Sequence, residues 1–148
     1  MAKIYEKPAD KEKERIITEI FCKHMNFQYS LPPARARYDF HIIQKANYGG
    51  QILDVIVGLA EVKVRTCSID AYPTYMLDAD KKNWMLDFAN EQRIPYLVVA
   101  WTDAIGWIDL RHKSFLSTGG RTDRNDINDF KLMVHYPIKA FNLLVDKR

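Results

Sequence analysis

The sequence predicts an α/β fold in which a helix, several strands, a second helix and a buried strand follow one another. Apolar residues recur at helical spacing in segments 10–25 and 77–92. Segments 38–44 and 51–65 read instead as extended chain, and 94–101 is an apolar run without polar alternation.

The N-terminal segment is expected to be a loose arm over residues 1–9, because it shows no periodic signal. The first helix is expected from 10 to 25, with Asp10 available as its N-cap. Glu14 comes three residues before Ile17 and seven before Phe21, which predicts a position at the inner edge of this helix. An acid there also fits a simple interaction with the helix dipole.

The next elements are expected to be strands. Segment 26–31 reads as a short strand that ends before Pro32 and Pro33. Segment 38–44 reads as a strand, 47–50 as a turn and 51–57 as the returning strand. Gly58 marks a bulge or a bend, so residues 51–65 form either one long bent strand or two strands.

The second half is expected to contain a loop, a helix and several strands, with a short segment around Phe141 packing at the end. The ranges are a loop at 67–74, a helix at 77–92, a buried strand at 94–101, its hairpin partner at 105–110, a long polar loop at 117–129 and a last strand at 130–137.

The composition indicates a single domain over residues 1–148, since 148 residues suffice for one core but not for two. No apolar run reaches the roughly 20 residues that a membrane-spanning helix needs, and the charged N-terminus is unlike a signal peptide. Cys22 and Cys67 lack the clustering of a zinc site or a disulfide framework. We therefore expect a cytoplasmic protein with no membrane partner.

The segment 59–65 contains a candidate site. In a strand, Glu61 and Lys63 share one face, whereas Ala60, Val62 and Val64 lie on the other. Burying charge costs several kcal/mol unless it is paired, hydrogen-bonded or bound to a metal, so two charged groups on a core strand indicate a site.

Basic residues lie close to these acids in the sequence. Arg35 and Arg37 precede Asp39, and Arg65 follows the Glu-x-Lys pair. Cations around carboxylates fit a phosphate backbone, although a solvated basic surface explains them as well. Lys81 falls on the apolar stripe of the second predicted helix, where it either snorkels from the core edge or reaches a phosphate or the catalytic centre.

Asp39 on one strand, Glu61-Val62-Lys63 on another and a following helix and buried strand together resemble the PD-(D/E)XK nuclease superfamily. Glu14 looks like the first-helix acid of many members, including archaeal Holliday junction resolvases. The resemblance covers residues 11–100 and is strongest to small phage and prokaryotic members. It implies a restriction-endonuclease-like αβββαβ core, with a central mixed sheet flanked by helices and extra C-terminal strands.

The resemblance also implies roles for the matching residues. Asp39, Glu61 and the Val62 carbonyl would hold Mg²⁺, with Mn²⁺ as a substitute, since phosphodiester hydrolysis requires charge neutralisation. Lys63 would position the attacking water and stabilise the developing charge, and Glu14 would support a second metal or its water shell. The expected substrate-binding residues are Lys81, Arg35, Arg37 and Arg65.

Asp54 competes with Asp39 as the first acid of the motif. We prefer Asp39, because the short interval between Asp54 and Glu61 leaves little room for a hairpin of two strands.

The resemblance implies a Mg²⁺-dependent DNA endonuclease that selects DNA by its structure, as junction resolvases do. We expect it to act in phage or prokaryotic recombination or repair. We also expect a homodimer. The alternatives are a sequence-specific restriction or homing endonuclease, and a non-catalytic nucleic-acid-binding protein of the same fold. In a further alternative, a plain structural domain, Glu61 and Lys63 form an exposed ion pair of little energy. The scattered histidines and the lack of a Gly-x-Ser-x-Gly motif or a phosphate-binding glycine loop argue against other catalytic classes.

Overall fold

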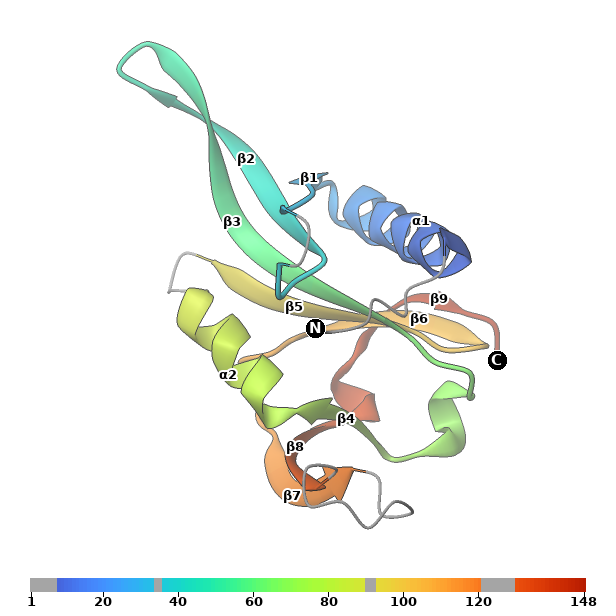
Figure 1. Ribbon diagram of the computed structural model, residues 1–148. Helices are drawn as coiled ribbons and strands as arrows, with labels where there is room; N and C mark the ends of the chain where they lie inside the picture. Colours follow the sequence, from blue (N-terminus) through green and yellow to red (C-terminus); the bar gives the residue numbers. More distant parts are fainter. Residues whose placement is uncertain (1–7, 34–35, 90–92, 121–129) are drawn as a thin grey trace.

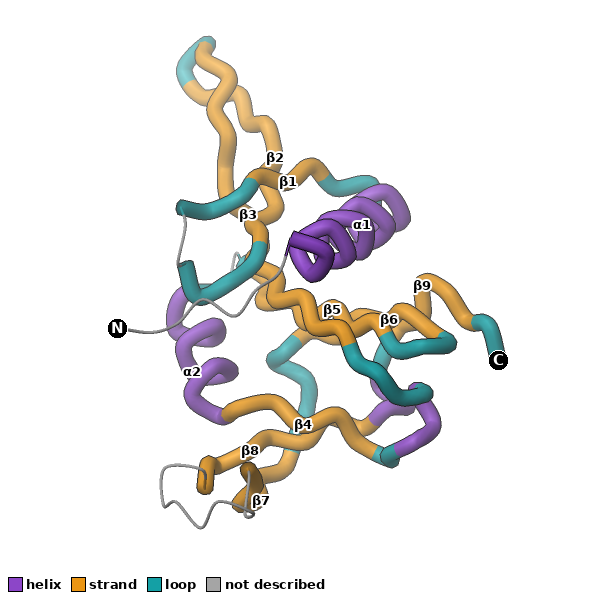
Figure 2. The backbone as a smooth tube through the Cα atoms, turned by 45° about the vertical axis from the view of Figure 1, so that its right-hand side comes forward, coloured by secondary structure: helices purple, strands orange, loops and turns teal. Residues whose placement is uncertain are grey.

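The computed structural model describes residues 8–33, 36–89, 93–120 and 130–148, which form a mixed α/β fold (Figure 1). Its centre is a six-stranded sheet with the strand order β1-β2-β3-β5-β6-β9. The strands are β1 (Gln28–Ser30), β2 (Phe40–Tyr48), β3 (Gln51–Val64), β5 (Ile94–Ala100), β6 (Ala104–Asp109) and β9 (Asn142–Asp146). Helices α1 (Pro8–Met25) and α2 (Ala79–Phe88) flank this sheet on opposite faces (Figure 2).

The order α1-β1-β2-β3-α2-β5, with a 3₁₀ turn and one short strand inserted between β3 and α2, confirms the predicted αβββαβ core. β3 and β5 run parallel, whereas the other neighbouring strands of the large sheet are antiparallel, so the sheet is mixed as expected. The parallel pair follows from the crossover connection through α2. This connection carries the chain back to the end of the sheet where β3 began, so β5 runs in the same direction as β3. The chain therefore has the restriction-endonuclease-like arrangement.

β3 is one strand of 14 residues, which answers the question that the sequence left open. Ile42 pairs with Gly58 but Ile43 pairs with Ile56, so Val57 is an extra residue that forms a bulge. A Cβ atom on Gly58 would lie 3.1 Å from the carbonyl oxygen of Ile94, so the close approach of the two strands favours glycine there.

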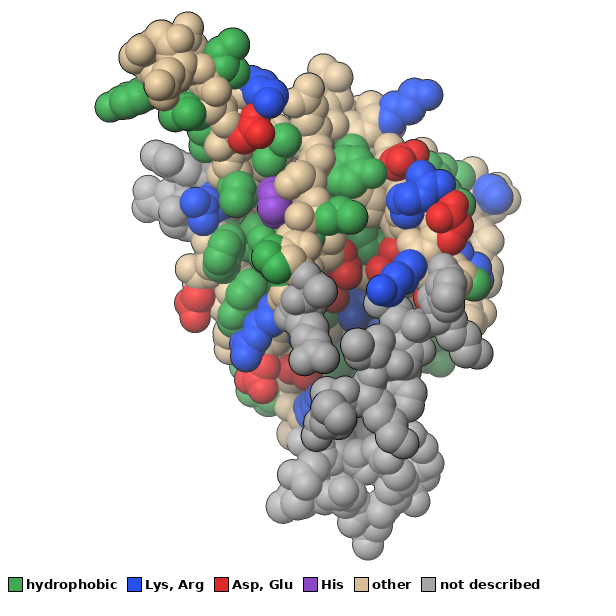
Figure 3. Space-filling view, turned by 45° about the horizontal axis from the view of Figure 1, so that its top comes forward, with side chains coloured by type: hydrophobic (Ala, Val, Ile, Leu, Met, Phe, Trp, Pro, Cys, Tyr) green, Lys and Arg blue, Asp and Glu red, His purple; other side chains and the backbone are tan. Residues whose placement is uncertain are grey.

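Beyond this bulge, β2 and β3 continue as a two-stranded hairpin that projects from the rest of the molecule (Figures 1 and 2). Its turn contains Gly49 and Gly50 with φ of 60° and 83°, the left-handed region that glycine adopts without steric cost. Apolar side chains lie on its surface (Figure 3), among them Tyr48 and Ile52, which are 78% and 73% exposed. The pairings of β1 and β5 reach only the base of the hairpin.

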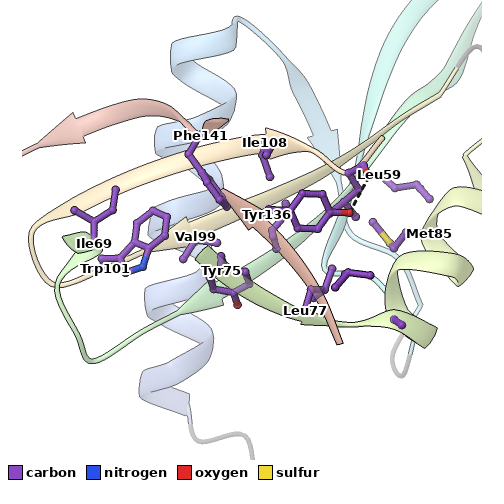
Figure 4. Close-up of a cluster of buried hydrophobic side chains, with 14 of the residues drawn as sticks. Leu59, Ile69, Tyr75, Leu77, Met85, Val99, Trp101, Ile108, Tyr136 and Phe141 are labelled. Atoms are coloured by element: carbon purple, nitrogen blue, oxygen red, sulfur yellow. Dashed lines mark hydrogen bonds between the residues drawn. The ribbon is translucent and has the colours of Figure 1, made fainter. Parts of the chain in front are cut away.

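Two apolar cores cover the two faces of the large sheet. On one face α1 buries Phe21 completely against Phe40 and Tyr96. On the other face, side chains from β3, β5, α2 and the second sheet converge (Figure 4). Tyr136 is fully buried there, and its hydroxyl donates to the carbonyl of Leu110 at 2.8 Å, which satisfies the polar end of the ring.

The second sheet has the strand order β4-β8-β7 and was only partly predicted. Its strands are β4 (Thr74–Asp78), β7 (Phe115–Gly120) and β8 (Phe130–Pro137). β8 confirms the strand predicted at 130–137, but it is not the last strand, because β9 follows it. The predicted loop at 117–129 is wrong for residues 117–120, which belong to β7, and residues 121–129 lie outside the described residues.

The segment before α2 also differs from the prediction. Instead of a loop at 67–74, the chain forms a 3₁₀ turn (Ile69–Ala71) and enters β4 at Thr74. α2 begins at Ala79 rather than at residue 77, because the Asp78 side chain accepts a hydrogen bond from the Asp80 N–H at 2.9 Å and caps the helix. α2 ends at Phe88, short of the predicted end.

The loose arm expected over residues 1–9 is wrong for residues 8 and 9, because α1 already begins at Pro8; residues 1–7 lie outside the described part of the chain. Among the helices that the structure describes, none is long and apolar enough to cross a membrane.

Candidate active site

Glu61 is a buried carboxylate on the face of β3 that α2 covers. It shares this face with Leu59, which belongs to the core, and its exposed fraction is only 5%. Glu61 Oε1 lies 3.2 Å from Lys63 Nζ, and Glu61 Oε2 lies 3.2 Å from Lys81 Nζ. The expected side-by-side placement of Glu61 and Lys63 is therefore observed. The alternative of an exposed ion pair is wrong, because Glu61 is desolvated and pairs with two cations.

One oxygen of Glu61 is incompletely satisfied. Oε2 is buried, and within the described residues it accepts no hydrogen bond, although the Lys81 ammonium lies nearby. The contact between Lys81 Nζ and Glu61 Oε2 is an ion pair without a hydrogen bond, and Lys81 Nζ also donates to the carbonyl of Arg37. A buried carboxylate oxygen without a donor is costly, and it is a group that a bound cation or an ordered water would satisfy.

Asp39 is held beside Glu61 by the backbone of β3. Its N–H donates to the carbonyl of Ala60 at 2.9 Å, and its Oδ2 accepts from the N–H of Val62 at 2.7 Å. In an extended strand, the N–H and C=O of one residue point to the same edge, so the Val62 carbonyl lies at the edge where Asp39 is bound. The Asp39 carboxylate is close enough to Glu61 to interact electrostatically, and the Val62 carbonyl points to the edge of β3 that Asp39 contacts.

The electrostatics of Asp39 reflect this crowding. Burial, and next the negative charge of Glu61, raise its pKa from 3.8 to about 6, against the opposing effects of the Val62 N–H and the ammonium groups of Lys63 and Lys81. A bound cation would offset both the burial of Asp39 and the repulsion by Glu61, so this position suits a cation.

The donor set fits a hard divalent ion. Among the described residues, no group of three or more His, Cys, Asp and Glu side chains could enclose a metal. Asp39, Glu61 and the Val62 carbonyl are all oxygen donors, and Mg²⁺ is commonly held by one or two carboxylates while water and substrate phosphate complete its coordination. These oxygen donors do not suit a metal that prefers sulfur or nitrogen ligands.

A cationic cleft of about 490 Å³ opens beside the carboxylates. Its lining includes the cations Arg37, Lys63, Arg65 and Lys81. Asp78 and Asp80, at the start of α2, line it as well. The Arg37 guanidinium lies over the ring of Trp84, 5.7 Å from its centroid. Three of the four expected substrate-binding residues thus line one cleft, and Arg35 lies outside the described residues. Positive charge in a concave surface suits an anionic phosphodiester.

Comparison with known proteins assigns a family. The model of the family described as "Phage putative PDDEXK endonuclease" matches residues 1–144 of the chain. The chain belongs to this phage PDDEXK endonuclease family. No curated protein and no solved structure matches it.

The remaining acids named from the sequence occupy different places in this PDDEXK chain. Glu14 lines a cavity of about 510 Å³ together with Asp39, so α1 brings this acid toward the first carboxylate from the opposite face of the sheet. Asp54 lies in the projecting hairpin, where its Oδ1 is 2.5 Å from Lys45 Nζ. Asp39, and not Asp54, is the acid that lies next to Glu61.

Sequence reasoning missed a residue that shapes the PDDEXK cleft. The Tyr75 hydroxyl accepts a hydrogen bond from Arg65 Nη2 at 2.6 Å, and the guanidinium lies 5.1 Å from the centre of its ring. Tyr75 thereby fixes Arg65 at the edge of the cleft. Little in the sequence indicated this role, because β4 is only five residues long and its alternation of buried and exposed side chains is visible only in the structure.

Proposed function

We propose that this chain is a Mg²⁺-dependent DNA endonuclease that hydrolyses phosphodiester bonds, with Mn²⁺ as a substitute ion. The observation that carries the proposal is the buried Glu61, placed beside Asp39 and paired with Lys63 on the same strand face. Membership of the phage PDDEXK endonuclease family supports the nuclease assignment.

Hydrolysis joins a water oxygen to phosphorus and breaks the bond from phosphorus to the leaving sugar oxygen. A divalent ion at the two carboxylates would lower the pKa of a bound water and neutralise phosphate charge. Lys63, whose side chain is 35% exposed, reaches into the cleft and would donate to the attacking water or to a phosphate oxygen as charge develops. Lys81 pairs with the second oxygen of Glu61 and would hold this carboxylate in place.

The remaining residues suit binding of the DNA backbone. Arg37 and Arg65 line the same cleft and would contact phosphates on either side of the cleaved bond, and Glu14 would support a second ion or its water shell. We further propose that the enzyme selects junctions or other branched DNA in phage recombination or repair, inside the infected cell. As a homodimer it would cut two strands with two such sites.

The test is cleavage of labelled four-way junction, flap, linear duplex and single-stranded DNA with Mg²⁺ or Mn²⁺. Glu61→Ala and Lys63→Ala should lose cutting, while Asp54→Ala, which removes a carboxylate from the hairpin of the same strand pair, should retain it. The preferred substrate would separate a junction enzyme from a sequence-specific one. DNA binding without any cutting would favour a non-catalytic protein, and cutting that survives Glu61→Ala would refute the site.

A further inference from the structure

A second cavity, of about 420 Å³, adjoins the cationic cleft. It lies between the segment that follows β3 and the outer face of the small sheet. Its walls are mainly apolar and aromatic, and they include Cys67, Ile69, Tyr72, Trp101, Met133 and Ile138. A pocket with this lining next to a charged site fits the apolar part of an otherwise charged ligand.

The two cavities are adjacent and share part of their walls. Arg65, Met76 and Met133 line both of them. The Arg65 guanidinium is held at this boundary by its hydrogen bond to the Tyr75 hydroxyl, so its charge stands between the carboxylate site and the apolar pocket. A ligand that places a phosphate at Arg65 would therefore place its neighbouring group in the pocket.

Several polar side chains of the pocket already have hydrogen-bond partners. Thr74 Oγ1 lies 2.9 Å from His135 Nδ1, and Ser68 Oγ donates to Asp103 at 2.6 Å. The pocket therefore presents ring faces and apolar surface more than unused donors and acceptors. Tyr72 is 66% exposed and Met76 is 47% exposed, so each presents an open surface for packing. Such a surface stacks on any base and does not read its edges.

We propose that this pocket receives an unpaired base of the DNA strand, one nucleotide away from the phosphate bound in the cleft. The inference rests on the proposed nuclease function, and it names what that function would select: a strand with a base free to leave the stack, as at a bulge or a branch point. Unpairing costs least where the base has no partner, which is how such a pocket discriminates against intact duplex.

The test compares two labelled duplexes that differ in one base. The first contains a single-nucleotide bulge, and the second contains the same bulge with its base removed. Binding is measured by fluorescence anisotropy with Ca²⁺ in place of Mg²⁺. We expect the protein to bind the bulge with a base about tenfold more tightly, and Tyr72→Ala to abolish the difference. Tyr72→Phe, which keeps the ring, should preserve it. Tyr48→Ala, which removes an even more exposed tyrosine from the hairpin tip, should preserve it too.

A chemical block provides an independent measurement. Cys67 lines the pocket, whereas Cys22 is buried and has a pKa raised to about 12 by burial and by Glu19, so a bulky maleimide should modify Cys67 selectively. The adduct should abolish the base preference, and Cys67→Ser should be insensitive to the reagent.

The outcomes separate this inference from the nuclease proposal. Cutting by the unmodified enzyme without any preference for the base would overturn the pocket and leave the nuclease intact. A base preference lost in Tyr72→Ala, in a protein that never cuts, would support the pocket and refute the nuclease. A base preference unchanged by both Tyr72→Ala and the maleimide adduct would overturn the pocket.

Discussion

Asp39→Asn should stabilise the metal-free protein while it abolishes cleavage. The pKa of Asp39 is raised from 3.8 to about 6, chiefly by burial and then by Glu61. Since each pKa unit corresponds to about 1.4 kcal/mol, ionised Asp39 opposes folding by about 3 kcal/mol at neutral pH. Asparagine retains an oxygen that can accept from the Val62 N–H, but it carries no charge.

The sign of the pH dependence follows from proton binding. A raised pKa means that the folded protein binds the Asp39 proton more tightly than the unfolded chain, so this contribution to stability is present below about pH 4 and is lost as the pH rises to about 6. The advantage of Asp39→Asn should therefore be under about 1 kcal/mol at pH 4 and about 3 kcal/mol at pH 8.

The assay is urea unfolding with EDTA present, followed by circular dichroism at both pH values, with Asp54→Asn as the matched control because Asp54 is half exposed. Mg²⁺ should then raise the stability of the wild-type protein and not that of Asp39→Asn, since the ion binds only the intact carboxylate pair. An equal effect of Asp39→Asn at both pH values, or a loss of stability at pH 8, would refute the argument from burial and charge.

Two further substitutions test the surroundings of the site. Lys81→Met removes a cation that lies 3.2 Å from Glu61 and that lowers the pKa of Asp39. The cleavage rate should fall by about 100-fold, and the acidic limb of the pH–rate profile should move to higher pH. An acidic limb at the wild-type pH would contradict this. Gly58→Ala places a Cβ 3.1 Å from the Ile94 carbonyl oxygen and should cost about 1–3 kcal/mol. An unchanged urea midpoint would show that the strands can separate without cost.

The parts of the fold that local patterns determine were predicted, and the parts that depend on distant partners were not. α1 has a long helical periodicity, and β5 is an uninterrupted apolar run. β4 alternates buried Tyr75 and Leu77 with exposed neighbours over only five residues, and Leu77 fits a helical stripe equally well. Its extended form depends on pairing with β8, about sixty residues later in the chain.

The site residues could be predicted from the sequence where charged side chains occur in a strand that is otherwise apolar. A glutamate and a lysine in an apolar strand are costly unless they serve a site, and this marked Glu61 and Lys63. Choosing Asp39 over Asp54 required an argument about strand pairing, because both acids lie in strand-like sequence. The contact between Lys81 and Glu61 depends on how α2 lies across the sheet, which no local pattern determines.

The hairpin explains why the two motif acids are so far apart in the sequence. Phe40 pairs with Ala60 at its base, so Asp39 and Glu61 meet wherever the chain turns. Residues added or lost in matched numbers near Gly49 would lengthen or shorten the arm without changing that pairing. Over evolutionary time, the interval between the acids can therefore drift while the catalytic geometry stays constant. In this chain the interval measures the length of an arm, and it carries no information about the separation of the carboxylates.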